Sequence, residues 1–258
     1  ASQFYWDRKL KNAPVLYLDT DFNREHIHIY AAGTNRSALD IGEKIMLENF
    51  CQKHDTTPWM FLLTCFQVLL SRISGVSELV IGTIYNNRDE EALKNIIGPL
   101  ANLVALRSAV KTDIAFTDYL SQVPQEYEES FRFAAIPFER VVTRVNPGKD
   151  MSRTAVFDII VHYEEQDGSE LGFEELELNR GLGKYDLNLL IKKGEQVEFV
   201  LTYNEKYFTK QRIKRLAGYF AETIRCMLRD PDTTIGRYNL ISEAEKQQLL
   251  SATDYKRV

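Results

Sequence analysis

Polar side chains gather where one apolar segment of the sequence ends, and these residues are the first candidates for chemistry. Leu79 to Tyr85 is rich in Val, Ile and Tyr, which predicts a buried strand. Five polar residues follow it, from Asn86 to Glu90, and a second strand is predicted over Asn102 to Ala109. Sites are often built at the ends of strands. The segment Leu79 to Ser108 is therefore the most informative stretch of the chain.

The other residues that could do chemistry are isolated in the sequence. His26 and His28 fall on one face of a strand predicted over His26 to Ala32, but no third metal ligand lies nearby, so we interpret both as surface histidines. His54 and His162 have no acid or nucleophile at a suggestive spacing. The glycines near Lys184 precede a strand instead of following one, which is wrong for a phosphate-binding loop. No metal site is predicted.

Composition restricts the class of protein. With 258 residues, 44% hydrophobic and 27% charged, the chain is typical of a globular protein. Its net charge of -5 is spread without a basic stripe, so nucleic acid is not an expected partner. Cys51, Cys65 and Cys226 are few and far apart, which favours a reducing, cytoplasmic location. No membrane-spanning run or signal peptide is evident, and the aromatic start without Met suggests a fragment.

Hydrophobic periodicity predicts alternating helices and strands. Ser37 and Asp40 suggest a capping box before an amphipathic helix that reaches Lys53. Thr57 with Pro58 suggests the start of a helix that is apolar on nearly all sides and stops at Gly75. Further elements are predicted as helices over 115–133, 136–145 and 213–227, and as strands over 155–163, 187–191 and 197–203. The expected fold is therefore one α/β unit, a mixed β-sheet covered by helices.

Several motifs, in the right order, resemble those of condensation domains from nonribosomal peptide synthetases. IGPLANLVALRS, from Ile97, resembles the family motif IGxFxNTLxLR, and SRISGVSELVIGTIYNNR, ending at Arg88, resembles hRYSGQDDIVIGTPVANR. AAIPFERVV resembles HQDLPFExLV, but Phe133, Ala134 and Ala135 stand where His, Gln and Asp are usual. KDMSRTAVFDIIVHY resembles RDxSRNPLFQVMF, and Lys184 to Asp186 resembles KFDL.

The resemblance implies one lobe of a two-lobed domain. The family fold is a pair of chloramphenicol-acetyltransferase-like lobes in a V, with the active site and the tunnel for phosphopantetheine arms between them. The family's HHxxxDG motif, whose second His is catalytic, is absent here, and Tyr5 and Trp6 resemble the YWxxxL that opens the C-terminal half. Residues 1–240 are thus expected to be the C-terminal lobe, and residues 241–258 a linker towards a following adenylation domain.

The resemblance also assigns roles to residues, none of them catalytic. Arg88 matches the Arg that pairs with the Asp of HHxxxDG, a task that suits a guanidinium fork; a local pair with Asp89 or Glu91 is the open alternative. The loop that floors the tunnel is matched by Gly98, Pro99 and Asn102. Support of the cleft, or a plain structural role, is expected for Pro137, Phe138, Ser152 and Arg153.

The implied function is amide-bond formation between a donor thioester and an acceptor amine on carrier proteins. No cofactor is expected to bind directly, because the phosphopantetheine arms of the carriers are substrates. Expected partners are the N-terminal lobe, the carrier proteins and the adenylation domain, and the chain alone is expected to be inactive. Two alternatives stay open: a non-catalytic lobe that docks carrier proteins, and part of an epimerising or cyclising relative.

Overall fold

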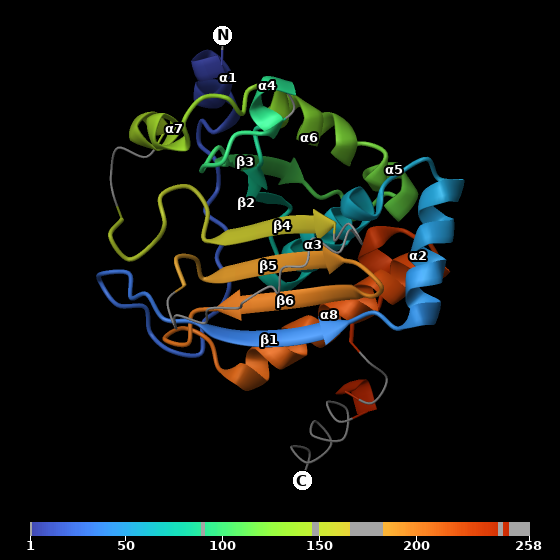
Figure 1. The fold of residues 1–258 in the computed structure, drawn as a ribbon. Coiled ribbons are helices and arrows are strands. Elements are labelled where there is room, and N and C mark those ends of the chain that lie inside the picture. Colours follow the sequence, from blue (N-terminus) through green and yellow to red (C-terminus); the bar gives the residue numbers. More distant parts are fainter. Residues whose placement is uncertain (1, 89–90, 146–149, 166–182, 242–244, 248–258) are drawn as a thin grey trace.

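A mixed six-stranded sheet forms the centre of the computed structural model, which describes residues 2–88, 91–145, 150–165, 183–241 and 245–247 (Figure 1). The strand order is β1-β6-β5-β4-β2-β3. The strands are β1 Gly33–Ala38, β2 Glu78–Tyr85, β3 Asn102–Ala109, β4 Ile159–Glu165, β5 Leu187–Lys193 and β6 Val197–Tyr203. β4 runs parallel to both β2 and β5, and the other neighbouring pairs are antiparallel. The predicted mixed sheet is confirmed.

Helices cover this sheet and its β3 edge. They are α1 Ser2–Lys9, α2 Ile41–Lys53, α3 Pro58–Ser74, α4 Glu91–Lys94, α5 Phe116–Leu120, α6 Val123–Arg132, α7 Phe138–Val145, α8 Lys210–Arg229 and the 3-10 helix η1 Ile235–Arg237. α3 and α8 pack on one face of the sheet, whereas α1, α4, α6 and α7 gather near β3 (Figure 1). None of the helices in the described ranges is long and apolar enough to cross a membrane.

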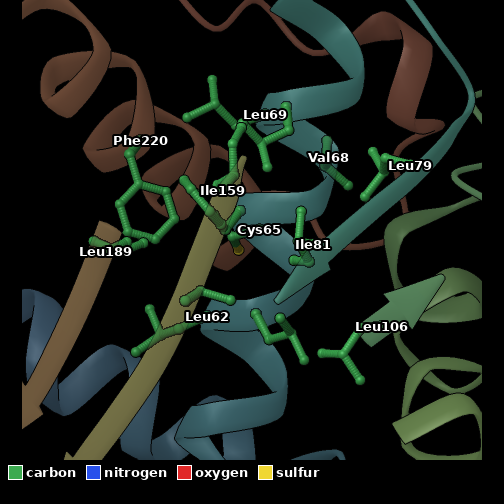
Figure 2. Close-up of a cluster of buried hydrophobic side chains, with 14 of the residues drawn as sticks. Leu62, Cys65, Val68, Leu69, Leu79, Ile81, Leu106, Ile159, Leu189 and Phe220 are labelled. Carbon is green, nitrogen blue, oxygen red and sulfur yellow. The ribbon is translucent and has the colours of Figure 1, made fainter. Parts of the chain in front are cut away.

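The main core lies between α3, α8 and the sheet. Leu62, Cys65 and Leu69 of α3 face Phe220 of α8 and the inward side chains of the strands (Figure 2). α3 is apolar on nearly all sides, which suits a helix enclosed by the sheet and by other helices; its buried Gln67 donates from Nε2 to Ser108. Its limits follow the sequence: the Thr57 side chain accepts a hydrogen bond from the backbone N–H of Met60, and Gly75 ends the helix with a left-handed φ of 72°.

The strand predicted over His26 to Ala32 is wrong. These residues have no ladder partner, and the strand begins at Gly33, where pairing with β6 starts at Gly33 and Tyr203. β6 ends at Tyr203, so residues 26–32 run past the end of the strand that pairs with β1. His28 is consequently not on an edge strand: it is buried, and its backbone N–H donates to the Met151 carbonyl over 2.7 Å.

Three other boundaries differ from the predictions. The helix predicted over 115–133 is two helices, α5 and α6, because Pro124 has no N–H to continue an α-helix across residues 121–122. The capping box of α2 uses Asp40 and Glu43, while Ser37 lies within β1. The strand predicted over 155–163 begins only at Ile159. Of the tail assigned as a linker, residues 242–244 and 248–258 lie outside the described residues.

The apolar side of α2 also differs from the pattern in the sequence. Leu47, Phe50 and Cys51 are buried, but Ile41 and Ile45 are exposed to solvent. The apolar residues of this helix therefore occupy two faces, and only the face towards α3 and α8 contributes to the core.

Candidate functional site

Arg88 holds the corner between β2 and β3. Its Nη1 donates to the carbonyls of Leu93 and Ile96 over 2.9 and 2.7 Å, and its Nη2 donates to the carbonyl of Gly98 over 3.0 Å. The guanidinium thus ties the strand end to α4 and to the residues that follow it. Asn87, with a left-handed φ of 52°, turns the chain out of β2 just before this point, a conformation that Asn adopts more readily than most residues.

Of the two local ion pairs considered for Arg88, the pair with Glu91 is not formed. Glu91 is paired with Lys94, over 2.6 Å, while Asp89 lies outside the described residues. A guanidinium has five N–H groups, and three donate here to backbone carbonyls, so two have no acceptor among the described residues. Ile97, Gly98 and Pro99 are exposed beside it, so this corner projects as an apolar tip with a cation at its base.

Asn102 connects β3 to the loop before α7. Its Nδ2 donates to the carbonyls of Ala134 and Ile136, both over 2.7 Å, and its Oδ1 accepts from the backbone N–H of Phe138 over 3.2 Å. A second residue holds the same loop: Trp6 Nε1 donates a hydrogen bond to the Phe133 carbonyl over 3.0 Å. The position of Phe138 is therefore set by a side chain 36 residues earlier in the chain.

Replacing Asn102 by Ala is expected to lower the free energy of unfolding by about 2 kcal/mol, because two carbonyls and one N–H in a partly buried loop lose their partner. Urea denaturation at neutral pH measures this change. Asn239→Ala is the control, since that side chain makes one exposed hydrogen bond of 3.4 Å, and its cost should stay below about 0.5 kcal/mol. Equal effects of the two substitutions would contradict this prediction.

A groove of about 840 Å³ lies between α7 and the loops that precede β4 and β5. Its walls are largely apolar, with Phe138, Val142, Met151, Val156 and Phe157 among the lining residues. Phe157 contacts Phe138 on one side, at 5.2 Å between ring centroids, and stacks on Tyr185 at 5.9 Å. The Phe157 ring also lies directly on Gly82 of β2, where a Cβ would overlap with it.

Ion pairs support the floor of this groove. Arg153, which lines the groove, donates from Nη1 to Asp158 over 2.5 Å. Arg24 makes a bidentate pair with Asp186 and also donates to the Ser152 carbonyl over 3.1 Å. The two carboxylates are buried at the starts of β4 and β5. Burial raises the pKa of Asp186, and the hydrogen bonds from Arg24 oppose that rise.

The predicted site residues thus fall into two groups that Asn102 links. Arg88, Gly98 and Pro99 form the α4 corner, beside α6, whereas Phe138 and Arg153 line the groove at the end of the sheet where β4 and β5 begin (Figure 1). Pro137 and Ser152 adjoin the groove in sequence. Ser152 caps its loop, since its N–H and hydroxyl both donate to Asp150 and lower the pKa of that carboxyl.

Two residues at or beside the groove were not predicted from the sequence. Arg24 is one: it does not line the groove, and its partner Asp186, 162 residues away, belongs to the Lys184 to Asp186 match. His28 is the other: it lines the groove, and both ring nitrogens are buried without a hydrogen-bond partner among the described residues. A second hollow, of about 300 Å³, lies where β2 and β4 end and is lined by aromatic rings that include Trp59, Tyr127 and Tyr163.

Comparisons with known proteins identify the family. The family model described as Condensation domain matches residues 1–250. Surfactin synthase subunit 1 of Bacillus subtilis (strain 168) is 28% identical over 255 residues, which are 96% of this chain and 7% of that protein. Gramicidin S synthase 2 of Brevibacillus brevis is 28% identical over 245 residues, 92% of this chain and 6% of that protein. The chain therefore spans less than a tenth of these two relatives.

Solved structures agree on the fold. The four-domain nonribosomal peptide synthetase holo-AB3403, bound to AMP and glycine, superposes with a TM-score of 0.88 at 21% identity, over 95% of this chain and 20% of that one. The X-domain from teicoplanin biosynthesis gives 0.85 at 21% identity, over 93% and 57%. The fold is therefore that of the chloramphenicol-acetyltransferase-like condensation domains. Together with the family match, this shows that the chain belongs to the condensation domain family.

Proposed function

We propose that this chain is the C-terminal lobe of a condensation domain that joins a donor acyl or peptidyl thioester to an acceptor aminoacyl amine. The family match over residues 1–250 carries the proposal. A second observation supports a single lobe: the chain aligns over 91–93% of its length, yet covers only 53–58% of the solved X-domain, the condensation domain of MokA and the first condensation domain of the calcium-dependent antibiotic synthetase.

The reaction requires alignment more than covalent chemistry from the protein. The acceptor amine attacks the thioester carbonyl, a C–N bond forms, the C–S bond breaks, and the proton lost by the amine goes to a base while the thiol leaves. The sequence contains no HHxxxDG motif, so this chain does not supply that histidine. Its contribution is one wall of the reaction chamber, built from the α4 corner and the groove beside α7.

Arg88 is the residue on which assembly of the two lobes depends in this proposal. Its two remaining N–H groups can bind a carboxylate of the N-terminal lobe while the other three keep the α4 corner in place. Gly98, Pro99 and Asn102 then form the floor beside it. The exposed side chain of Ile97 adds apolar surface for the other lobe to cover.

Carrier proteins with phosphopantetheine arms are the proposed substrates, and the adenylation domain is the proposed neighbour. We also place the reaction in the cytoplasm. The cysteines are compatible with that location, because they are free thiols and burial raises the pKa of Cys51 to about 12, which keeps it protonated and unreactive.

The purified chain is expected to form no dipeptide when mixed with aminoacyl and peptidyl carrier proteins, because the base of the missing lobe is absent. Mass spectrometry of the carrier-bound products measures this. The same assay with the two-lobed parent domain is the positive control, and there Arg88→Lys should reduce the rate because Lys cannot reproduce the fork. Dipeptide formation by the chain alone above the uncatalysed rate would contradict the proposal.

A non-catalytic docking lobe is the second candidate. The absence of HHxxxDG from this chain favours it, and one solved structure with the same fold is a complex of the X-domain and OxyB. Two measurements separate catalysis from docking: titration of a carrier protein against the labelled chain, and the dipeptide assay with the two-lobed parent. If the carrier protein binds the chain and the two-lobed parent forms no dipeptide, the result supports docking alone. An epimerising or cyclising parent would instead show its own product in that assay.

A further inference from the structure

A polar hollow of about 340 Å³ lies between α1, the end of β3 and α6 (Figure 1). It shares no lining residue with the groove beside α7. Charged side chains of both signs line it in equal number, and they are Arg8, Lys9, Arg107, Glu78, Glu126 and Glu129. The hollow is therefore rich in charge but neutral as a whole.

Arg107 fixes the shape of this hollow with contacts inside the chain. Its Nε donates to Glu78 over 2.7 Å, and its Nη1 donates to the carbonyls of Lys9 and Lys11 over 2.8 and 2.9 Å. The end of α1 is thereby tied to β3. Because these contacts set the distance between the helix and the sheet, the hollow is preformed, which lowers the cost of ordering it around a ligand.

The other four charged side chains face the hollow without pairing across it. Within the described ranges, neither Arg8 nor Lys9 forms an ion pair with Glu126 or Glu129. Oε2 of Glu126 is buried and has no hydrogen-bond partner in these ranges. Burial raises the pKa of this carboxyl, and a hydrogen bond from Ser108 opposes the rise. A buried carboxylate oxygen is stabilised by a charged N–H donor, so this part of the hollow favours an ammonium group.

The two pairs of charges together select a ligand that carries both signs. An anion would be attracted by Arg8 and Lys9 but repelled by the two glutamates, and a cation would meet the reverse. A small zwitterion avoids both repulsions, because its carboxylate and its ammonium can each face the opposite charge. The volume suits a small molecule, since ligand pockets start at about 300 Å³.

We propose that this hollow binds a free α-amino acid, with its carboxylate at Arg8 and Lys9 and its ammonium at Glu126 and Glu129. A carrier-bound aminoacyl thioester has no free carboxylate, so this ligand is distinct from the substrates of the condensation reaction. The bound amino acid connects α1 to α6. It raises the Tm of the chain, because it binds the folded state only.

Backbone amide NMR of the ¹⁵N-labelled chain at low salt tests the proposal with three probes. L-alanine carries both charges, whereas propanoate lacks the ammonium and ethylamine lacks the carboxylate. L-alanine should shift the amide signals of Ala109 and Glu129, which line the hollow. Each of the other two probes should bind at least about tenfold more weakly, because one charge-assisted contact is lost and one repulsion remains.

Substitutions of single charges locate the site. Arg8→Gln and Glu129→Gln should each weaken binding of L-alanine about tenfold. Lys11→Gln and Glu128→Gln are the matched controls, since they remove the same charges from exposed side chains outside the lining, and they should bind L-alanine as the unmodified chain does. The Tm without ligand should be the same in all four variants, which shows that each is folded.

Four results overturn the proposal: no shift at tens of millimolar L-alanine, shifts no larger around the hollow than elsewhere, equal binding of propanoate or ethylamine, or equal weakening in the control variants. The dipeptide assay does not bear on this titration, because the hollow and the groove beside α7 have no lining residue in common.

Discussion

Asp186→Ala is expected to lower the free energy of unfolding by about 3–5 kcal/mol, the usual range when one partner of a buried ion pair is removed. The side chains of Arg24 and Asp186 are only 14% and 7% exposed. Without the carboxylate, the guanidinium of Arg24 would stay buried over the ring of Tyr207, at 4.2 Å from its centroid, and the Ser152 carbonyl would be its remaining acceptor among the described residues. Urea denaturation at pH 7 measures the loss.

An exposed ion pair of the same chain provides the comparison. Glu91 and Lys94 are 83% and 53% exposed, so Glu91→Ala should cost less than about 1 kcal/mol. The double variant Arg24→Leu with Asp186→Leu should cost less than the sum of the two single changes, because no charge is then left buried. If Asp186→Ala is no more harmful than Glu91→Ala, the pair does not stabilise the floor of the groove as argued.

Acidification from pH 7 to pH 4 is expected to remove about 3 kcal/mol of stability through His162 alone. Burial lowers the pKa of His162 from its ordinary 6.5 to about 4, so its pKa differs by about 2.5 between the unfolded and folded states. Between these two pKa values the unfolded chain binds the proton and the folded chain does not. Stability is therefore complete above pH 6.5 and falls as the pH drops towards 4.

The substitution His162→Leu isolates this contribution from that of the carboxylates. His162 lies on the middle of β4, opposite Leu190 of β5, where a leucine fits the strand. The difference in unfolding free energy between the variant and the unmodified chain should grow by about 3 kcal/mol from pH 7 to pH 4, because only the unmodified chain loses this stability. A difference that does not change with pH would show that His162 protonates equally in both states.

Elements with local signals could be predicted from the sequence. The start and end of α3 follow from Thr57, Pro58 and Gly75, since a capping side chain, a fixed φ and a left-handed glycine act within one helical turn. The hairpin of β5 and β6 follows from alternation around the turn at Gly194. The helix predicted over 115–133 was wrong, because the chain breaks at residues 121–122, just before Pro124 in the first turn of α6.

The motifs determined the family, and they marked the residues around which the candidate site is built. The polar residues Asn86, Asn87 and Arg88 do lie at the end of a buried strand. Among the described residues, the guanidinium of Arg88 contacts carbonyls, because the chain returns through α4 and presents its unsatisfied carbonyls to it. The roles of Arg88 and of Gly98, Pro99 and Asn102 towards a second lobe stay predictions.

What only the tertiary structure decided are the contacts between residues far apart in the chain. Arg24 with Asp186, Asn102 with the loop before Phe138, and His28 with Tyr207 are pairs that sequence periodicity cannot indicate, because periodicity reports which face of an element is buried and not what lies against it. The sequence by itself determined most of the elements, the family and the absence of the histidine motif. The groove, its ionic floor and its buried imidazole exist only once the sheet has brought these segments together.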